Sequence, residues 1–236
     1  GMSIYSFGEL FVTSRVDFSP YHAIIVCRDL LTGALVWTSP DLGSESILYP
    51  MGFNEDAVYA HDYYSGYFYA LDASDGSIKW VSENTSYTFA PMDGVIYTCG
   101  RDLIINGELG SWQESTICLD NETGEVLWTN HNLYAVTPNE TKAAYNDHLY
   151  MITGAINQPI KLVAVDMRTG ENLYYSEELP GDGDQEGPLA VGPDGTIFFC
   201  RDGGDLYAVN DNGSGFDILW THTPISEGLH KNYVID

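Results

Sequence analysis

The stretch DLLTGALVW, residues Asp29–Trp37, decides the fold because it recurs along the chain. Three more copies keep its length: Asp72–Trp80 (DASDGSIKW), Asp120–Trp128 (DNETGEVLW) and Asp166–Tyr174 (DMRTGENLY). A fifth copy, Asn210–Trp220 (NDNGSGFDILW), is two residues longer. The closing aromatic residues stand 43 to 48 positions apart. A fixed period of this size indicates an array of one repeated structural unit.

Each part of the motif has a mechanical role in a β-hairpin. The leading Asp can accept hydrogen bonds from the backbone N–H groups just ahead of it, which tightens a turn. The Gly supplies the positive φ that a type I turn followed by a bulge requires. An apolar residue precedes the aromatic by two positions, as in Leu35 and Trp37. Because side chains alternate along a strand, we expect these two to share one face.

A second hairpin is predicted upstream of each motif, so that each unit has four antiparallel strands, A to D. The expected A–B hairpins are 5–12, 52–59, 92–97, 145–150 and 192–199. No segment shows sustained helical periodicity. The sequence therefore predicts an all-β fold, a β-propeller of four-stranded antiparallel blades forming one domain over residues 1–236. The expected blades are 3–41, 42–83, 84–131, 132–178 and 179–222.

The C-terminal residues 228–236 resemble one further strand, which leaves two readings of ring closure. In the first, this strand completes a closed five-bladed ring. In the second, the chain is part of a larger propeller. An unclosed ring would expose sheet edges and blade faces, so we would then expect self-association.

Charge excludes one class of partner. The chain has 34 acidic and 9 basic residues, a net charge of −25. Such a field repels nucleic acid and favours cations or basic partners, although solubility alone also explains it. No apolar run approaches 18 residues, so no membrane span is predicted.

Loop lengths indicate where a ligand would bind. The A–B and C–D turns are short, whereas the B–C and D–A connections are longer and lie together at the other end of a four-stranded meander. Variable loops on a rigid scaffold are common binding sites. Tyr63, Tyr64 and Trp112, the last within the predicted loop 101–114, are therefore candidate contacts to a protein or carbohydrate ligand, with loop packing as the alternative.

One loop has the pattern of a cation site. Asp182, Asp184 and Glu186 alternate and are followed by a glycine, as in the first half of a calcium loop. Carboxylate oxygens suit Ca²⁺. However, the twelfth position holds Pro193 instead of a glutamate. A solvated acidic turn is therefore the alternative. The six histidines show no zinc-site spacing.

The repeat, with strands such as Leu206-Tyr207-Ala208-Val209 ahead of the Asp and Trp eight residues after it, resembles that of quinoprotein alcohol dehydrogenase-like (PQQ-like) propellers, including BamB-like proteins. The resemblance covers nearly the whole chain. It implies radially packed blades, with the Trp docking between neighbours. In the dehydrogenases of this family it implies PQQ beside a vicinal disulfide, a Trp and Ca²⁺, and it suggests an extracytoplasmic location.

The cysteines argue against PQQ. No two are adjacent; Cys27 and Cys118 occupy the position of Ala70, Ala164 and Ala208 in the other units. Cys99 and Cys200 are aligned with one strand B position that holds Thr13, His61 and Ile152 elsewhere. We interpret all four as small buried thiols, with a Cys99–Cys118 disulfide as the alternative.

Three functions follow as hypotheses. The first is a non-catalytic scaffold that binds a protein or glycan, with no catalytic residues assigned. The second is a fragment or relative of a quinoprotein-type dehydrogenase. The third is a BamB-like outer-membrane assembly factor, which in that family usually carries a lipidated N-terminal cysteine that this sequence lacks. A fold alone does not choose among them.

Overall fold

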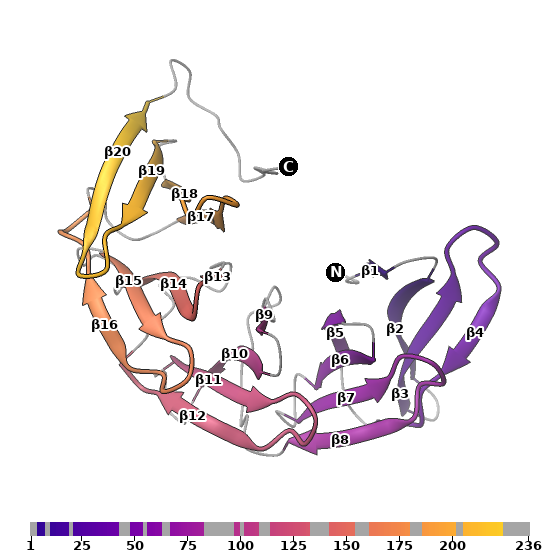
Figure 1. Ribbon diagram of the computed structural model, residues 1–236. Helices are drawn as coiled ribbons and strands as arrows, with labels where there is room; N and C mark the ends of the chain where they lie inside the picture. Colours follow the sequence, from indigo (N-terminus) through magenta and orange to yellow (C-terminus); the bar gives the residue numbers. More distant parts are fainter. Residues whose placement is uncertain are drawn as a thin grey trace. The chain divides into compact units, whose positions relative to one another are not determined.

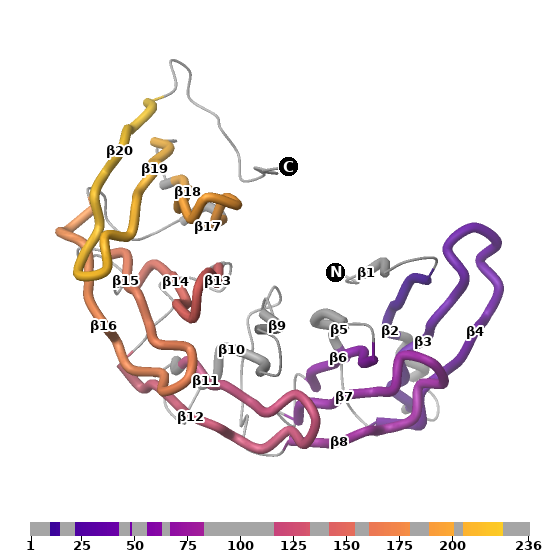
Figure 2. The backbone as a smooth tube through the Cα atoms, viewed as in Figure 1, coloured from indigo at the N-terminus to yellow at the C-terminus, as the bar shows by residue number. Residues whose placement is uncertain are grey.

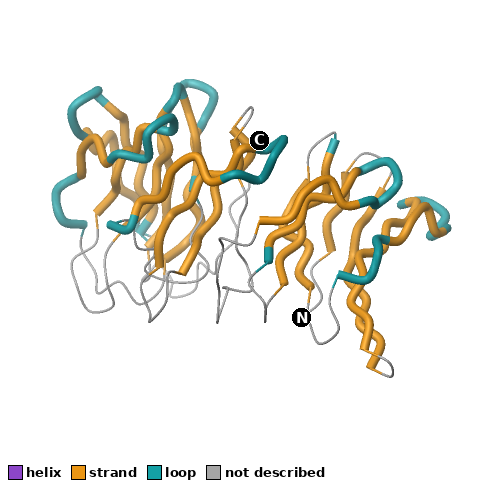
Figure 3. Tube along the Cα trace, turned by 90° about the horizontal axis from the view of Figure 1, so that it is seen from below, coloured by secondary structure: helices purple, strands orange, loops and turns teal. Residues whose placement is uncertain are grey.

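The computed structural model describes residues 4–7, 10–18, 21–42, 48–53, 56–62, 67–82, 97–99, 102–108, 114–132, 142–153, 161–179, 186–201 and 205–223 (Figure 1). Figure 2 follows the backbone in the same view. The chain divides into two compact units, 1–113 with 117–127 and 114–116 with 128–236. The regular elements described here are all β-strands (Figure 3). The described residues contain no helix that is long and apolar enough to span a membrane.

Strands assemble in chain order into four-stranded antiparallel sheets (Figure 1). The first is β1 (Ile4–Phe7), β2 (Leu10–Phe18), β3 (Tyr21–Asp29) and β4 (Leu35–Thr38). The second is β5 (Leu48–Phe53), β6 (Ala57–Asp62), β7 (Phe68–Asp72) and β8 (Ile78–Ser82). The third is β9 (Tyr97–Cys99), β10 (Asp102–Glu108), β11 (Glu114–Asp120) and β12 (Val126–Asn130), and the boundary between the units runs through it.

The second unit holds the last two sheets. The fourth is β13 (Ala143–Tyr145), β14 (His148–Thr153), β15 (Lys161–Asp166) and β16 (Asn172–Tyr175). The fifth is β17 (Glu186–Val191), β18 (Ile197–Arg201), β19 (Leu206–Asp211) and β20 (Phe216–His222). The predicted all-β, four-stranded architecture is confirmed. The proposed extra strand at 228–236 lies outside the described residues, and the single domain and blade limits stay predictions.

The motif hairpins form as expected. Gly33, Gly76, Gly124 and Gly170 have φ between 70° and 76°. In all four, the Gly N–H donates to the carbonyl of the leading Asp at 2.8–2.9 Å. The Asp side chain also accepts from the turn, as where Asp120 Oδ1 receives the N–H groups of Glu122 and Thr123 at 2.9 and 2.8 Å. The motif therefore specifies a rigid turn that does not depend on distant contacts.

The aromatic of one sheet packs on the glycine of the next within each unit. Trp80 is 7% exposed, and its Nε1–H donates to the Asn121 carbonyl at 2.9 Å. A Cβ placed on Gly124 would lie 2.5 Å from the Trp80 ring. Trp37 contacts Ala73 and Gly76 in the same way, and Trp128 contacts Met167 and Gly170. Glycine is thus required twice, for its positive φ and for its missing side chain.

One expectation about strand D is wrong in detail. Trp37 pairs with Cys27, but the next pair is Leu35 with Arg28, so a bulge interrupts the register. The same shift recurs between Ala70 and Leu71 and in the fourth and fifth sheets. Leu35 is 55% exposed while Trp37 is 6% exposed. Leu35 and Trp37 therefore do not share a buried face, because a bulge between them breaks the alternation of side chains along the strand.

The third sheet differs from the predicted arrangement. Cys99 lies on β9 and pairs with Asp102 on β10, so residues 102–108 form a strand where a loop was expected. The run Leu103–Ile105 is apolar and contains two β-branched isoleucines, which explains the strand. Cys99 therefore does not occupy the strand B position assigned to it. Because β10 lies between β9 and β11, Cys99 and Cys118 are not hairpin neighbours, and Cys118 is a buried thiol.

The other cysteine positions can be read from the register. Cys27, Ala70, Ala164 and Ala208 each pair with the motif aromatic, which confirms one shared position for these four. Cys200 faces Leu206, as His61 faces Phe68 and Ile152 faces Leu162, so these three also correspond. Thr13 was assigned wrongly. Ser14 is the equivalent in the first sheet, because it faces Ile25 two residues before Cys27.

His61 is a buried titratable group of the first unit whose pKa is strongly shifted. Its side chain lies on β6, and the residue is 4% exposed. Burial lowers the pKa of His61 to about 4, against a smaller opposing effect of the Asp62 carboxylate. The imidazole is therefore neutral in the folded protein at pH 7.

We expect substitution of Gly76 to cost more than the same change at an open glycine. Gly76→Ala strains a positive φ and forces a methyl into the Trp37 ring. Strain contributes about 1–2 kcal/mol and overpacking about 1–3 kcal/mol. Gly213→Ala is the control, since φ is +83° there and nothing lies within 4 Å of the added carbon. The free energy of unfolding in urea is measured for both variants. If Gly76→Ala and Gly213→Ala lower it equally, the contact between Gly76 and the Trp37 indole is not tight.

We expect the free energy of unfolding to fall as the pH falls from about 6.5 to about 4. The folded pKa of His61 lies below its ordinary 6.5, so the unfolded chain binds more protons in this window. The contribution is about 3 kcal/mol. His61→Ile copies the residue that the fourth sheet holds at this position and should flatten the profile, whereas the exposed His222→Gln should not. Urea midpoints measured across this range test it, and parallel profiles for wild type and His61→Ile would count against it.

Candidate functional site

The structure does not describe the side chains of the residues that the sequence predicts as ligand or metal contacts. Tyr63, Tyr64, Trp112, Asp182 and Asp184 lie outside the described residues. Glu186 begins β17, where its backbone pairs with Arg201, but its side chain is not described. The aromatic contacts and the calcium loop therefore stay predictions.

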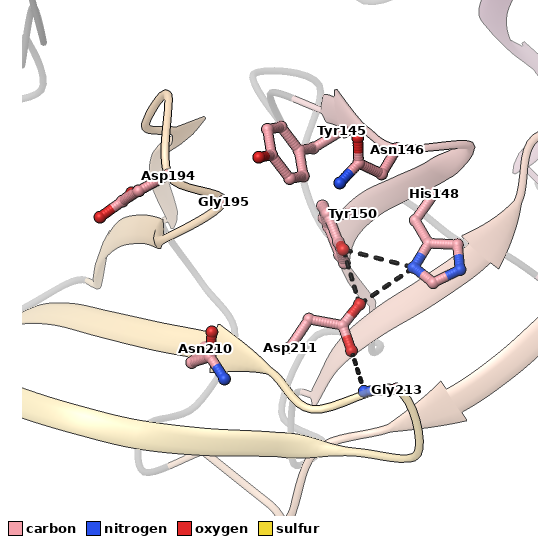
Figure 4. Close-up of a pocket in the computed structure, with 9 residues that line it drawn as sticks. All are labelled: Tyr145, Asn146, His148, Tyr150, Asp194, Gly195, Asn210, Asp211 and Gly213. Atoms are coloured by element: carbon pink, nitrogen blue, oxygen red, sulfur yellow. Dashed lines mark hydrogen bonds and ion pairs between the residues drawn. The ribbon is translucent and has the colours of Figure 1, made fainter.

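The described residues of the second unit do form a pocket, at the end of the sheets where the short turns lie. It has a volume of about 220 Å³. Its walls come from the β13–β14 turn and from the β17–β18 and β19–β20 turns (Figure 4). The lining residues are Tyr145, Asn146, His148, Tyr150, Asp194, Gly195, Asn210, Asp211 and Gly213.

Local turn chemistry shapes the walls. Asn146 and Asp147 both have positive φ, 49° and 65°, and Tyr145 pairs with His148 across them. Two consecutive positive φ values at a two-residue loop define a type I′ hairpin, which favours Asn and Asp. On the opposite wall, Gly195 has a φ of 86°, and a Cβ there would lie 2.8 Å from the Tyr145 ring. The missing side chain thus lets Tyr145 lie against the neighbouring turn.

Asp211 organises the floor of the pocket. Its Oδ2 accepts from the Tyr150 hydroxyl at 2.6 Å and lies 3.0 Å from His148 Nδ1. Its Oδ1 accepts from the Tyr174 hydroxyl at 2.5 Å and from the Gly213 N–H at 2.7 Å. Figure 4 shows His148 and Tyr150 directed at this carboxylate. One side chain of β19 thus ties the fifth sheet to β14 and β16 of the fourth.

These bonds shift the pKa values in opposite directions. Burial alone would raise the pKa of Asp211, but hydrogen bonds from Tyr150, Tyr174, Gly213 and His148 lower it below its ordinary value. Burial and the hydrogen bond to Asp211 raise the pKa of the Tyr150 and Tyr174 hydroxyls. Asp211 therefore stays charged and both phenols stay protonated at neutral pH. We call this arrangement the Asp211 clamp, because the carboxylate keeps both phenols protonated and their hydrogen bonds keep the carboxylate charged.

The rim is also acidic. Asp194 is exposed, and hydrogen bonds from Thr196 lower the pKa of its carboxyl. Exposed Asn146 and Asn210 add amide groups, and the half-buried Tyr145 adds a ring. Carboxylates, amide oxygens and an aromatic face together suit a guanidinium or ammonium group. Chemically, the pocket is equipped to hold a cationic side chain.

Sequence reasoning missed this pocket, although two signals pointed to it. Of the five motif copies, the fourth alone ends in Tyr, and the fifth alone is longer. The structure joins these departures, because Tyr174 donates to Asp211 where Trp donates to a backbone carbonyl in other sheets. A Tyr in place of the motif Trp, followed by a lengthened hairpin in the next copy, thus indicates in the sequence that the contact between these two sheets is altered.

The residues present do not fit the quinone site that the family resemblance implies. The sequence has no adjacent cysteines, and Cys27, Cys118 and Cys200 are buried thiols within strands. The described ranges contain no group of three or more His, Cys, Asp or Glu side chains placed to hold a metal ion. The vicinal disulfide of that site thus has no counterpart in this sequence.

Comparison with known proteins identifies the architecture. The sequence profile of the family described as outer membrane protein assembly factor BamB matches residues 21–234. No curated protein sequence matches the chain closely enough to count as a relative.

Solved structures show the same fold at low identity. BamB from Moraxella catarrhalis is 22% identical, with a TM-score of 0.58 over 94% of this chain and 63% of that one. The quinohemoprotein alcohol dehydrogenase from Comamonas testosteroni is 15% identical, with a TM-score of 0.63 over 95% and 43%. The computationally designed protein Ika8 is 15% identical, with a TM-score of 0.65 over 94% and 61%. This chain thus spans less than two thirds of the length of each.

We expect Asp211→Asn to destabilise the second unit by about 1–3 kcal/mol at pH 7, because it weakens bonds to two phenols and a histidine. Asp217→Asn removes an exposed carboxylate from the same hairpin and should cost little. The difference should shrink as the pH falls through the lowered pKa of Asp211, since stability from such a carboxylate is present only above it. Urea unfolding at pH 7 and pH 3 measures this; equal stabilities for both variants at pH 7 would contradict the clamp.

Proposed function

The chain belongs to the family of the outer membrane protein assembly factor BamB, and on this premise we propose that it is a non-catalytic scaffold that binds a protein partner. The observation that carries the proposal is the acidic pocket of the second unit. Its carboxylates are held charged by hydrogen bonds, and its rim is open to solvent. A basic side chain of the partner would enter it.

Charge supports this choice of partner. With 34 acidic and 9 basic residues, the chain attracts a basic segment and accelerates its approach. Asp194 then supplies the local acceptor for one Arg or Lys, Asp211 adds a second negative charge beside it, and Tyr145 supplies a ring for the cation to stack against. The long-range field brings the partner near, and the pocket selects the side chain.

The internal bonding of the site favours binding over chemistry. Both oxygens of Asp211 already accept bonds from the protein, and the pKa of Tyr150 and of Tyr174 is raised, away from the range in which a phenol exchanges protons at neutral pH. A general acid or base needs a pKa near the working pH and an accessible proton. The family name also describes an assembly factor, which agrees with a protein partner outside the cytoplasm.

We expect a short arginine peptide to bind this pocket. The probe is acetyl-Gly-Gly-Arg-Gly-Gly-amide, titrated into isotopically labelled protein and followed by NMR shifts of the β13–β14 and β17–β18 turns. Its citrulline counterpart, a neutral isostere, should bind at least fivefold more weakly. Asp194→Asn should weaken arginine binding to a similar degree, because one of two pocket carboxylates is removed.

Two controls decide the location. Asp217→Asn removes an exposed carboxylate outside the pocket and should leave the affinity unchanged. A triple alanine variant of Tyr63, Tyr64 and Trp112 tests the longer loops instead. If Asp217→Asn weakens binding as much as Asp194→Asn does, the attraction is diffuse and the pocket is not the site. If the triple variant alone abolishes binding, the ligand face is the one predicted from loop lengths.

The enzyme alternative is tested separately with PQQ and Ca²⁺ together. The scaffold proposal predicts no rise in the melting temperature and no change in the absorbance of the quinone. A saturable shift would overturn it in favour of a quinoprotein-type enzyme.

A further inference from the structure

The second unit contains another pocket, at the end of β12 and beside the β15–β16 hairpin. Its volume is about 460 Å³, and it is lined by two short segments, 129–132 and 169–172. All lining residues except Gly170 have polar side chains. The docking of Trp128 on Gly170 brings the two segments together. The pocket therefore lies within one unit, and it shares no lining residue with the acidic pocket around Asp211.

A pair of amides orders this pocket. The Asn130 Nδ2 group donates to the Gly170 carbonyl and, at 2.8 Å, to Asn172 Oδ1. Asn172 Nδ2 donates in turn to the Tyr175 hydroxyl. Asn130 Oδ1 accepts the backbone N–H of Asn132 at 2.9 Å. Each amide is thus held by at least two hydrogen bonds, so its donors and acceptors point in fixed directions before any ligand binds.

Both amides depart from the repeat. Asn130 stands two positions after its motif aromatic, where three other sheets have serine: Ser39, Ser82 and Ser176. Asn172 stands two positions before its aromatic, where the four other copies have an apolar residue: Leu35, Ile78, Val126 and Ile218. The two departures stand 42 positions apart in the chain, and the structure brings them into one contact. Packing alone does not require this pair, because Trp37 and Trp80 contact their glycines without it.

Hydrogen-bonding groups around the amide pair are unused. His131, Asn132 and Glu171 are exposed lining residues, and within the described part of the chain their side chains bond to no other group. An imidazole and an amide can each donate and accept, and a carboxylate accepts. The pocket thus combines an ordered amide pair with free donors and acceptors beside it.

We propose that this pocket binds a neutral sugar ring in the pyranose form. Each sugar hydroxyl donates one hydrogen bond and accepts others, so a ring of adjacent hydroxyls matches closely spaced amide, imidazole and carboxylate groups. The fixed amide pair lowers the ordering cost of binding. This inference does not depend on the proposed protein partner.

The lining argues against other classes of ligand. The net charge of −25 repels an anion. Glu171 is a single carboxylate, and it is therefore a weaker target for a cation than the two carboxylates of the acidic pocket. The lining contains no large apolar side chain, whereas the anchors of peptide interfaces are aromatic or apolar residues in buried pockets.

The test is a titration of the isotopically labelled chain with three methyl glycosides, the β-glucoside, the α-mannoside and the β-galactoside, each to 50 mM. We expect at least one to bind with a saturable NMR shift of the backbone amides of 129–132 and 169–172. Sorbitol is the matched control ligand, because its hydroxyls lie on an open chain that has to be ordered on binding, and it should bind at least fivefold more weakly. If no glycoside saturates by 50 mM, or if sorbitol binds as well as the glycosides do, the proposal is overturned.

Two variants restore residues of the other copies. Asn130→Ser and Asn172→Leu each break the amide pair with a residue that the repeat accepts at that position. Both should therefore fold and bind the sugar at least tenfold more weakly. His131→Ala, at an exposed position, should weaken binding at least threefold while the pair stays intact. Asn212→Ser removes an exposed amide of the same unit that lines neither pocket, and it should bind like wild type.

The arginine peptide separates this site from the acidic pocket. Its affinity should be the same for Asn172→Leu and for wild type, so that either proposal can fail alone. Sugar binding that is unchanged in the two pair variants, or in His131→Ala where those variants do not fold, would overturn the sugar site, since the ligand would then lie elsewhere.

Discussion

The rest of the structure depends on the contact between an indole ring and a glycine held at positive φ. Three such contacts repeat with the same donor distance of 2.9 Å from Nε1 to a carbonyl. The glycine first makes the hairpin turn and then, through its missing side chain, makes room for the ring of the preceding sheet. A turn requirement and a packing requirement thus fall on one residue. This explains why Gly recurs at the fixed place in the four motif copies of equal length while the residues around it vary.

The candidate site is a local variation on that contact. In the fourth sheet the ring is Tyr174, whose hydroxyl lies at the end of the ring, and the fifth hairpin is two residues longer. Asp211 directly follows Asn210, at the position whose carbonyl accepts the Trp in the other sheets, and its side chain receives the hydroxyls of Tyr174 and Tyr150. A neutral contact with a backbone carbonyl is replaced by a charged clamp with an acidic opening beside it. A site built this way retains the rigidity of the repeat while it changes its chemistry, as expected of function added to a common scaffold.

Much of the fold could be predicted because its determinants are local. The Asp side-chain bonds and the glycine φ values depend on residues within one turn, and both were foreseen from spacing. The shared position of Cys27 and Ala70 followed from alignment of the motif. The bulge before each motif aromatic was not foreseen, since it changes the register without changing the composition. The strand at 102–108 is not predicted from the motif spacing, because a long segment between motifs is typical of a loop, although its β-branched residues favour a strand. The pocket was missed because it forms between turns of two sheets, and the sequence aligns such turns without showing which of them meet.

A double-mutant cycle at Trp128 and Gly170 tests the central claim most directly, because both residues lie in the second unit and contact each other. The free energy of unfolding is measured for wild type, Gly170→Ala, Trp128→Leu and the double variant. If the glycine is required for the ring, the Ala substitution should cost much less once the indole is gone, with a coupling of about 1–3 kcal/mol. Strictly additive losses would mean that Gly170 serves only its backbone turn, and the account of the repeat as a chain of indole–glycine contacts would be wrong.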